Sequence, residues 1–516
     1  MRVAIYTLGC KVNQYETQAM EAELTGRGHA LVPFDGAADA YVINTCTVTA
    51  VSDKKSRQMI RQARKRSPHA VVAVCGCYAQ TDPEAVEALG VDLVMGTADR
   101  MGFLDALEAL SPDGGHPVVR VDDALRRRQY EHLPAGGLEG RTRAMLKVED
   151  GCVNFCTYCI IPYARGPIRS LPLEEAACEA KRLAGAGYRE LVLTGIEISS
   201  WGHDLKNGQG LIDLVEAVCA AAPECRVRLG SLEPRTVTED FCRRAAALPN
   251  LCPHFHLSMQ SGCDATLKRM NRKYDSARYY ESVTLLREHF DRPGITTDLI
   301  VGFPGETEEE FDQTLDFVRR CAFSAMHIFP YSRRTGTPAA ALPGQVPKAE
   351  KEARARRARL EQYRAAEDGR VFFRREEARP YVFLEEDIIL EKEIDFLLKK
   401  LEHRHQDYLK IIGSQCMGAA VDEEWLSRGV YNHFSRVFFL TEPGLPHDDA
   451  LPAGEYACLY YRGAYDRLEE HCGVLLAGIA AAGRRPAGPP LELYRVDAHD
   501  TNREEEYVTE LQMRVE

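Results

Sequence analysis

The chain has 516 residues, of which 45% are hydrophobic and 28% are charged, and its net charge is −12. This length predicts about three soluble globular domains, and the acidic balance excludes indiscriminate nucleic-acid binding, so any RNA contact must be a local basic patch. No apolar run reaches about eighteen residues, and Met1 leads directly into a strand-like segment, so we expect no membrane span and a cytoplasmic protein. Its 17 cysteines, an odd number, favour reduced thiols and metal ligands over a disulfide framework.

Residues 1–112 are predicted to form a parallel sheet of strand–helix units. Three apolar runs alternate with segments of helical period, at Val3–Leu8, Tyr41–Asn44 and Val71–Val74. Each run ends at or just before a cysteine, and the carboxyl ends of parallel strands share one edge of a sheet. We therefore expect three thiols to converge at this edge, although free cysteine also packs well as a small core residue.

The expected metal ligands at this edge are Cys10, Cys46 and Cys77. Cys77 is favoured over Cys75 because Cys75 lies on the apolar run, whereas Cys77 follows Gly76 into the loop.

The residues around these cysteines carry a family resemblance. Thr7–Gln18, Asn44–Val48 and Gly76–Gln80 resemble the amino-terminal domain of the methylthiotransferases. Within that family, Lys11-Val-Asn-Gln-Tyr-Glu16 resembles the bacterial branch that acts on N6-threonylcarbamoyladenosine in tRNA. It is less similar to the branches that act on isopentenyladenosine or on a ribosomal-protein aspartate.

Two further segments of the first 140 residues have a distinct composition. The stretch Lys54–Arg66 holds seven basic and no acidic residues, so a helix there would present a positive face suited to RNA phosphate or simply a solvated surface. Residues 113–140 are rich in glycine and weakly apolar, which predicts a linker with room for one edge strand.

A second group of cysteines, Cys152, Cys156 and Cys159, has C-x₃-C-x₂-C spacing on one loop. Three thiolates can hold three irons of a [4Fe-4S] cube and leave the fourth open, which favours chemistry over scaffolding. The alternative is a structural zinc loop with a distant fourth ligand. The flanks Lys147–Asp150 and Ile160–Pro167 resemble the radical S-adenosylmethionine (SAM) enzymes. The resemblance implies that SAM binds the open iron and is cleaved to a 5′-deoxyadenosyl radical.

Six strand candidates alternate with helix-length segments in residues 141–345. They are Met145–Val148, Leu191–Leu193, Val227–Leu229, His254–Leu257, Thr297–Val301 and Met326–Phe329. This alternation predicts parallel βα units that close into a barrel or part of one, and six units fall short of the eight of a full barrel. The radical SAM resemblance implies a partial (β/α)6 barrel with a lateral opening for a bulky substrate.

Polar groups follow these strands at the carboxyl ends, where barrel active sites are built. Each combines a glycine turn with carboxylate, hydroxyl or amide groups that could bind SAM, although such motifs also serve as helix caps and turns. The expected SAM contacts are Thr194, Glu197, Glu233, Arg235, Ser258 and Gln260. Glu197 and Glu233 are the preferred contacts, and Arg235 is expected to face the SAM carboxylate.

The last part of the chain departs from the methylthiotransferase pattern. Residues 346–369 are predicted to be a charged helical connector around Lys348–Arg364, and residues 370–516 an α+β domain in place of the small β-barrel that usually ends the family. Phe372–Leu384, Leu451–Tyr465 and Glu505–Met513 resemble the effector-binding domain of multidrug-sensing MerR-type regulators. That resemblance implies a duplicated strand–helix–strand–strand unit around an aromatic pocket.

A ligand is expected in this domain. Several tyrosines offer aromatic faces, and an unpaired Glu510 inside an apolar strand would be costly. We therefore expect an organic-cation or adenosine-like ligand at Tyr461 and Glu510, unless Glu510 faces solvent on an alternating strand. No helix-turn-helix precedes the domain, which argues against a transcription factor.

The combined resemblance implies a methylthiotransferase with two [4Fe-4S] clusters and SAM. One cluster would generate the radical, and the other would donate methylated sulfur to adenosine C2 of N6-threonylcarbamoyladenosine next to the tRNA anticodon. Expected partners are the tRNA anticodon loop and a reductant such as flavodoxin or ferredoxin. The alternatives are the same chemistry on a small molecule or peptide bound with help of the last domain, and a non-catalytic cluster or ligand sensor.

Overall fold

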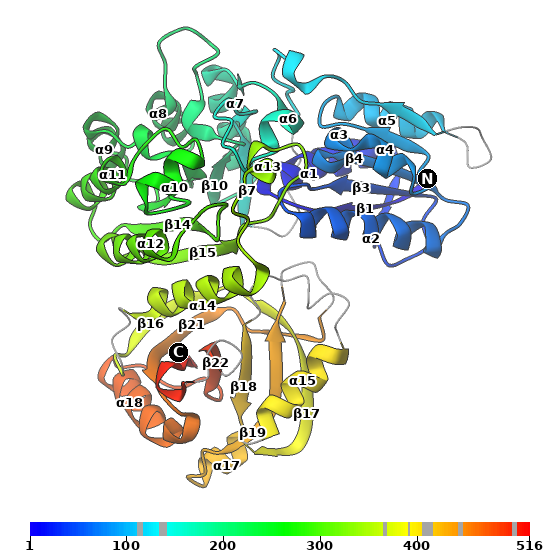
Figure 1. Cartoon of the computed structure of the whole chain (residues 1–516). Coiled ribbons are helices and arrows are strands. Elements are labelled where there is room, and N and C mark those ends of the chain that lie inside the picture. The colour runs from blue at the N-terminus through cyan, green and yellow to red at the C-terminus, as the bar shows by residue number, and fades with distance from the viewer. Residues whose placement is uncertain are drawn as a thin grey trace. The chain divides into compact units, whose positions relative to one another are not determined.

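The computed structural model describes residues 1–110, 117–133, 142–364, 369–390, 393–404, 416–441, 447–497 and 503–516. They divide into two compact units, Met1–Ala355 and Arg356–Glu516. The first unit contains an N-terminal sheet and a partial barrel, and the second contains one antiparallel sheet with its helices (Figure 1). None of the described helices is both long and apolar enough to cross a membrane.

The N-terminal sheet has six parallel strands in the order β2-β1-β3-β4-β5-β6. The strands are β1 (Arg2–Thr7), β2 (Ala30–Val32), β3 (Ala40–Thr45), β4 (Val71–Gly76), β5 (Leu93–Met95) and β6 (Val118–Arg120). The helices are α1 (Lys11–Gly26), α2 (Ala50–Arg66), α3 (Cys77–Thr81), α4 (Pro83–Glu87), α5 (Arg100–Ala109) and the 3₁₀ helix η1 (Ala124–Arg126).

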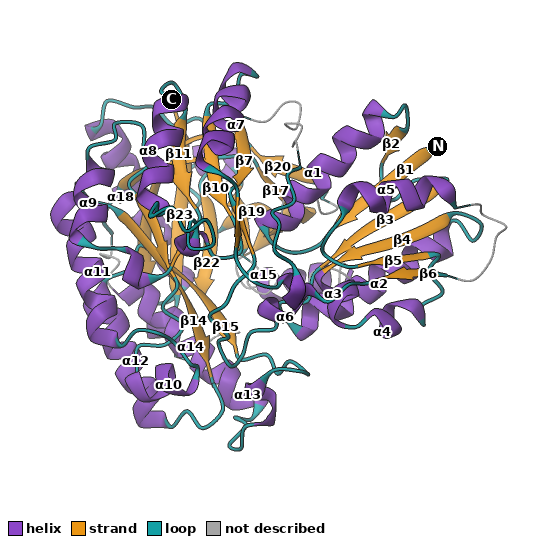
Figure 2. Ribbon diagram, turned by 90° about the horizontal axis from the view of Figure 1, so that it is seen from above, coloured by secondary structure: helices purple, strands orange, loops and turns teal. Residues whose placement is uncertain are grey.

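Helices cover both faces of this sheet (Figure 2). On β3, Tyr41 and Ile43 pack in a core with residues of α2, whereas Ala40 and Val42 pack in a second core with residues of α1 and α5. Because both faces are buried, the strands are apolar along their length rather than alternating. Polar residues are therefore found at the strand ends, where Cys10, Cys46 and Cys77 lie. We call these three residues the first cysteine group.

The partial barrel consists of parallel strands in two sheets, in the orders β11-β10-β7 and β12-β13-β14-β15. The strands are β7 (Arg143–Lys147), β10 (Glu190–Thr194), β11 (Arg226–Leu229), β12 (Ser231–Leu232), β13 (His254–Leu257), β14 (Gly294–Val301) and β15 (Ala325–Pro330). All six predicted strands are present, and β12 is a short addition that the sequence did not reveal.

Helices follow the barrel strands in turn. They are α6 (Ile161–Arg165), α7 (Leu173–Gly185), η2 (Ile198–Ser200), α8 (Leu211–Ala221), η3 (Pro234–Thr236), α9 (Glu239–Ala246), α10 (Asp264–Arg269), α11 (Ser276–His289), α12 (Glu308–Cys321) and α13 (Pro338–Ala341). A small antiparallel ladder of β8 (Glu149–Asp150) and β9 (Arg169–Ser170) flanks the second cysteine loop. The predicted charged helix is α14 (Lys348–Arg364), which crosses the boundary between the two units.

The second unit is an eight-stranded antiparallel sheet in the order β16-β21-β23-β22-β18-β19-β17-β20. The strands are β16 (Phe372–Glu376), β17 (Arg379–Leu390), β18 (Met417–Val421), β19 (His433–Leu440), β20 (Asp449–Leu451), β21 (Gly454–Arg462), β22 (Leu491–Val496) and β23 (Val508–Val515). The helices are α15 (Ile394–Arg404), α17 (Glu423–Ser427), η5 (Tyr465–Arg467), α18 (Leu468–Ala481) and η6 (Glu504–Glu506). The runs β17-α15-β18-β19 and β21-α18-β22-β23 form the predicted duplicated unit.

The predicted fold class is confirmed in its three parts: a parallel N-terminal sheet, a partial barrel and an α+β C-terminal domain. The segment 113–140 was predicted to be a linker that could contain one edge strand, and β6 is that strand. The predicted domain boundaries themselves stay predictions.

Candidate active site

Three cysteines lie at one edge of the N-terminal sheet, at the carboxyl ends of three adjacent parallel strands. Cys10 directly precedes α1, Cys46 follows β3, and Cys77 begins α3 directly after β4. Cys10 is exposed, whereas Cys46 and Cys77 are buried. The three strand ends thus lie on one edge of the sheet, and the role of these cysteines as metal ligands stays a prediction.

The loops of this edge approach each other closely at Gly9. Gly9 has a φ of +104°, and a Cβ atom there would lie 2.8 Å from Cys46 Sγ. Asn13 ties the same loops together, since its Nδ2 donates to Leu8 O at 2.7 Å and to Thr45 O at 3.0 Å. Only glycine permits both this backbone conformation and this approach.

Cys75 lies in a different environment from the three cysteines at the edge. It is fully buried on β4 and belongs to the core under α1 and α5. Burial raises the pKa of Cys75 to about 11 and the pKa of Cys77 to about 12, although Arg165 partly opposes the rise at Cys77. The packing of Cys75 supports the prediction that Cys77 is the third ligand.

The second cysteine group lies on the loop between β8 and α6. Cys156 is buried, and Cys152 and Cys159 are half-buried. Cys159 N donates to Cys156 O at 2.9 Å, and Asn154 N donates to Cys152 Sγ at 3.5 Å. Burial raises the pKa of the Cys152 thiol, and it raises the pKa of Cys159 to about 12. Metal binding to these thiols would therefore release protons.

Each cysteine group receives a hydrogen bond from an arginine that the sequence analysis did not single out. Arg165 Nε donates to Cys77 Sγ at 3.4 Å, and Arg272 Nη1 donates to Cys156 Sγ at 3.4 Å. Arg165 lies in the segment 160–167 that carried the radical SAM resemblance, so its position was visible but its role was not. No spacing in the sequence signals Arg272.

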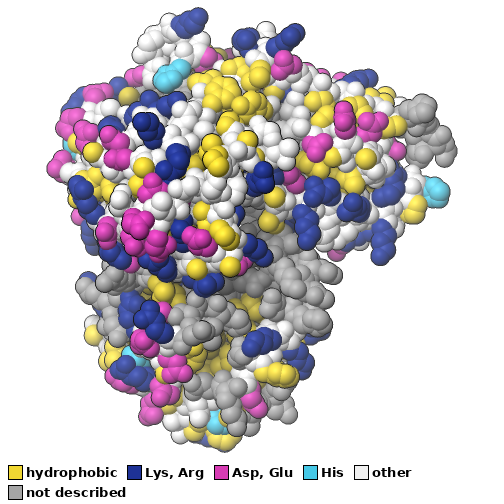
Figure 3. Space-filling view, viewed as in Figure 1, with side chains coloured by type: hydrophobic (Ala, Val, Ile, Leu, Met, Phe, Trp, Pro, Cys, Tyr) yellow, Lys and Arg dark blue, Asp and Glu magenta, His cyan; other side chains and the backbone are white. Residues whose placement is uncertain are grey.

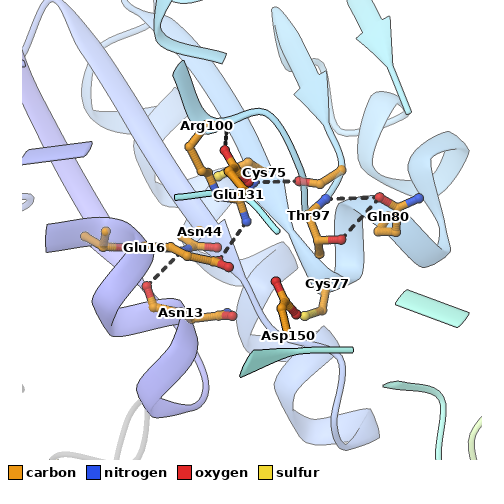
Figure 4. Close-up of polar contacts among 12 residues, drawn as sticks. Asn13, Glu16, Asn44, Cys75, Cys77, Gln80, Thr97, Arg100, Glu131 and Asp150 are labelled. Atoms are coloured by element: carbon orange, nitrogen blue, oxygen red, sulfur yellow. Dashed lines mark hydrogen bonds and ion pairs between the residues drawn. The ribbon is translucent and has the colours of Figure 1, made fainter. Parts of the chain in front are cut away.

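Beside Cys77 lies a buried group of charged side chains, which we name the bridging cluster. Figure 4 labels three of its members, Glu16, Arg100 and Asp150. The bridging cluster joins Glu16 and Arg100 of the N-terminal domain to Lys147, Asp150, Arg165 and Arg169 of the barrel, all at most 4% exposed. Arg100 lies 2.8 Å from Glu16, and Lys147 lies 3.2 Å from Glu16 and 2.8 Å from Asp150. Ion pairs thus connect the two domains behind the first cysteine group.

The bridging cluster carries more positive than negative charge. It contains four cationic side chains and two carboxylates. Glu131 adds one further carboxylate, which accepts from the Arg100 backbone N–H at 2.5 Å. Glu149 adds none, because burial raises its pKa well above the usual range. A buried excess of positive charge is costly unless an anion lies nearby. Arg165 and its neighbours therefore reduce the cost of a negative charge at Cys77, although burial still keeps the pKa of the free thiol raised.

A single metal ion and an iron–sulfur cube make different demands on their ligands. Among the residues that the structure describes, no three Cys, His, Asp or Glu side chains form a group that could hold one ion. A structural zinc needs four ligands at about 2.0–2.3 Å, whereas in an iron–sulfur cube each thiolate binds a different iron. Each cysteine group supplies three thiols, which is the number that a cube with one open iron needs.

The six predicted SAM contacts lie along the carboxyl edge of the barrel. Thr194 ends β10, Glu197 directly precedes η2, Glu233 follows β12, Arg235 lies in η3, and Ser258 and Gln260 follow β13. The structure therefore brings these residues to the edge that also carries the second cysteine loop. Their contact with SAM stays a prediction.

Contacts tie this edge to the second cysteine loop. Glu197 Oε2 accepts from Asn154 Nδ2 on the loop at 3.4 Å, and Ser258 O accepts from Arg272 Nη2 at 3.0 Å. Glu233 and Arg235 instead pair with each other at 2.9 Å. Contact of SAM with either of these two residues would therefore have to compete with their ion pair.

Gln260 owes its position to its backbone. It has a φ of +65°, and its N–H donates to Asp298 O at 2.8 Å on the neighbouring strand β14. The residue is 9% exposed. This hydrogen bond fixes the backbone of Gln260 against β14, so the position of its Cα atom at the barrel edge is constrained.

Glu510 of the second unit is buried and paired by the protein itself. Its carboxylate lies 2.7 Å from Arg374 and 2.6 Å from Arg495, and it accepts from Gln512 Nε2 at 2.7 Å. The alternative that Glu510 faces solvent is therefore wrong. Tyr460, not Tyr461, is opposite Glu510 in the sheet register, so Tyr461 and Glu510 point to opposite faces and cannot line one pocket.

Tyr461 instead contacts a carboxylate that the sequence analysis missed. Its hydroxyl donates to Glu492, which is 1% exposed and also accepts from Tyr494 OH at 3.0 Å. The ring of His471 stacks on Tyr461 with a centroid distance of 4.2 Å. Only the alternating strand around Glu492 hinted at a buried carboxylate.

Comparison with known proteins decides the family. The model of the radical SAM superfamily matches residues 146–318. Threonylcarbamoyladenosine tRNA methylthiotransferase MtaB of Bacillus subtilis is 43% identical over 348 residues, which cover 67% of this chain and 76% of that protein. The chain belongs to the radical SAM methylthiotransferase family. It is therefore an enzyme that depends on SAM and on iron–sulfur chemistry.

Two further relatives match a similar share of this methylthiotransferase, and family models match its first and last domains. The protein of the same name from Thermotoga maritima is 41% identical over 68% of this chain and 80% of its own length. A tRNA-2-methylthio-N(6)-dimethylallyladenosine synthase from Acetivibrio thermocellus is 34% identical over 68% and 74%. Residues 2–96 match the uncharacterized protein family UPF0004, and residues 376–516 match the GyrI-like small molecule binding domain. The predicted effector-binding resemblance of the last domain is thus confirmed.

The cysteine groups of this methylthiotransferase fit iron–sulfur ligation. A thiol sulfur is a weak hydrogen-bond acceptor, and the N–H groups of Arg165 and Arg272 are better matched by the thiolates of a bound cluster. The positive excess of the bridging cluster also suits an anionic group. Cys152, Cys156 and Cys159 have the spacing that carried the radical SAM resemblance.

Proposed function

We propose that this methylthiotransferase inserts a methylthio group at C2 of N6-threonylcarbamoyladenosine next to the tRNA anticodon, using two [4Fe-4S] clusters. The first would be held by Cys152, Cys156 and Cys159, and the second by Cys10, Cys46 and Cys77. When bound, the clusters supply a 5′-deoxyadenosyl radical and a methylated sulfur. The protein's own side chains bind the clusters and SAM and keep water from the reacting atoms.

One contact carries the two-cluster proposal. Arg165 ends α6, the helix that follows the Cys152–Cys159 loop, and it donates to Cys77 Sγ at 3.4 Å. The helix that directly follows one cysteine group therefore reaches a member of the other. A radical and a sulfur donor can act on one carbon only when both are held beside it, and this contact supports that arrangement.

The basic helix α2 supports a tRNA substrate. It begins shortly after Cys46, and Lys54, Arg61 and Lys65 are exposed on it. Figure 3 shows Lys and Arg side chains gathered over this helix. Because the chain is acidic overall, a local basic surface beside the site is the feature that phosphate contact needs. The relatives from Bacillus subtilis and Thermotoga maritima are also named for threonylcarbamoyladenosine in tRNA.

The α2 surface can be tested by charge reversal. Changing Lys54, Arg61 and Lys65 together to Glu should weaken tRNA binding and reduce its salt dependence, since about one counterion is released per phosphate contact. Iron content should stay at the wild-type level. An unchanged affinity and salt slope would assign α2 to solvated surface.

The C-terminal domain is proposed to bind a small cationic or adenosine-like molecule. Glu492 is the candidate contact, because Tyr461 and Tyr494 donate to it and the His471 ring stacks on Tyr461. Stacked rings with a carboxylate favour a flat or cationic ligand. The proposed electron donor is a flavodoxin or ferredoxin.

The substrate is tested in cells. Bulk tRNA from a strain that lacks this protein should lose the methylthio form of threonylcarbamoyladenosine in nucleoside mass spectrometry, and the wild-type gene should restore it. The Cys46→Ala variant should not restore it, although it keeps the radical cysteine loop. Unchanged tRNA in a strain with no second such enzyme would move the proposal to a small-molecule or peptide substrate.

The sequence analysis left a non-catalytic sensor open, and membership of the enzyme family argues against it. Purified sensor protein would bind SAM without consuming it, whereas this enzyme should release 5′-deoxyadenosine on reduction. The polar edge from Thr194 to Gln260 beside the second cysteine loop favours the enzyme.

A further inference from the structure

Arg165 is the point at which the barrel reaches the N-terminal cysteine group. It is the last residue of α6, and its side chain is fully buried. The next residue, Gly166, has a φ of +78°, and a Cβ atom there would lie 2.0 Å from Ala124 O. This close packing fixes the backbone, so the guanidinium enters the N-terminal domain from a rigid anchor.

The hydrogen bonds of Arg165 saturate its guanidinium, which has five N–H groups. Nη2 donates to Asn13 Oδ1 at 2.7 Å and to Glu16 Oε2 at 3.1 Å. Nη1 donates to Glu16 Oε1 and, at 3.4 Å, to Asp150 Oδ2. The Nε–H donates to Cys77 Sγ at 3.4 Å. Four donors thus meet oxygens, and the fifth is directed at a sulfur.

A buried arginine N–H that donates to a cysteine sulfur should change the reduction potential of the cluster that this sulfur would bind. Hydrogen bonds to cluster sulfurs and nearby charge are among the factors that set the reduction potential of an iron–sulfur cluster. Both stabilise the reduced form, which carries one more negative charge, and so both raise the potential. The bridging cluster adds its positive excess to the effect of the Arg165 hydrogen bond.

We propose that Arg165 is a positioning residue that fixes Cys77 and raises the reduction potential of the second cluster, an inference that rests on the two-cluster function proposed above. The same side chain holds Asn13, which ties the loops of Cys10 and Cys46. Docking of α6 and ordering of Cys10, Cys46 and Cys77 are therefore one event. Assembly of the second cluster then requires the barrel to be folded against the N-terminal sheet.

The test isolates the second cluster in the full-length chain. Cys152, Cys156 and Cys159 are changed together to Ala, and the chain is reconstituted anaerobically and counted for iron. Four irons per chain are expected in this background, and eight in the wild type. A background chain without iron would refute the proposed second cluster itself, separately from the role of Arg165.

Arg165→Met and Arg165→Lys are then titrated with reductant while the cluster signal is followed by electron paramagnetic resonance. Arg165→Met should lower the equilibrium constant for reduction at least tenfold, which is about 59 mV for one electron. Arg165→Lys keeps the charge but loses the planar fork. The reduction potential of this variant should therefore lie between those of the wild type and Arg165→Met. Arg354→Met is the matched control, because Arg354 is 3% exposed and lies 2.8 Å from Glu306 but has no hydrogen bond to a cysteine among the described residues.

The outcomes separate positioning from general stability. A lowered potential in both Arg165 variants with an unchanged value in Arg354→Met supports the inference. Loss of iron from both Arg165 variants, with iron retained in Arg354→Met, supports the positioning role. Wild-type iron content and a wild-type potential in Arg165→Met would overturn the inference.

Discussion

Glu16 is the carboxylate on which the bridging cluster depends, and Glu16→Gln is the sharpest stability test. Three cations surround it: Arg100 at 2.8 Å, Lys147 at 3.2 Å and Arg165 at 3.1 Å. Removing one partner of a buried ion pair costs about 3–5 kcal/mol, because the other charges stay buried without compensation. We expect Glu16→Gln to lower the free energy of unfolding of the first unit by that amount.

The assay is urea unfolding of the apoprotein, followed by tryptophan fluorescence. The chain has two tryptophans, Trp201 in the first unit and Trp425 in the second. In a Trp425→Phe background, the signal reports only on Trp201, which is fully buried. Asp240→Asn is the control, since its ion pair with Arg243 is mostly exposed and should contribute less than about 1 kcal/mol.

The loss should also depend on pH. Burial alone would raise the pKa of Glu16, but Arg165, Arg100 and Lys147 outweigh it and hold the pKa well below the usual range. A carboxylate with a depressed folded-state pKa stabilises the protein above its unfolded pKa of about 4.3, and this contribution is lost as the pH falls through the folded pKa. The difference between wild type and Glu16→Gln should therefore shrink below about pH 4. A loss under about 1 kcal/mol at pH 7, equal to that of Asp240→Asn, would refute the reasoning.

Three further outcomes are expected. Gly9→Ala should lower the iron bound by the N-terminal cysteines, because its Cβ would lie 2.8 Å from Cys46 Sγ, whereas Gly28→Ala, also at positive φ but with open space, should keep wild-type iron. Arg272→Met should slow 5′-deoxyadenosine release more than it lowers iron content, because it removes the hydrogen bond to a radical-loop sulfur; equal slowing and iron loss would assign it a structural role only. Glu510→Gln should lower the unfolding free energy of the second unit by about 3 kcal/mol, as followed by Trp425 fluorescence; an effect below about 1 kcal/mol would mean that its arginines find other partners.

Local patterns were enough to predict the elements that carry the cysteines. Cys10, Cys46 and Cys77 follow apolar runs, and parallel topology alone brings such strand ends together. The C-x₃-C-x₂-C loop is likewise a matter of spacing within one segment. The six barrel strands followed from their alternation with helices, whereas β12 is only two residues long and leaves no periodic signal.

Contacts between distant segments could not be predicted in this way. Arg165 and Cys77 are 88 residues apart, and Arg272 and Cys156 are 116 apart. A lone arginine in a sequence carries no mark of the sulfur that it will meet. Glu510 and Glu492 show the same limit, since strand alternation predicts that residues change faces but not which face is lined by arginines and which by tyrosines.

The central claim is that one chain couples SAM cleavage to sulfur insertion at two cysteine groups. The most direct measurement is anaerobic incubation of the reconstituted enzyme with dithionite, SAM and threonylcarbamoyl-modified tRNA, with 5′-deoxyadenosine and modified nucleosides quantified together. Wild type should form both products, Cys156→Ala neither, and Cys46→Ala only 5′-deoxyadenosine. Methylthio nucleoside formed by Cys46→Ala at the wild-type rate, or no change in the tRNA while wild type releases 5′-deoxyadenosine, would contradict the account.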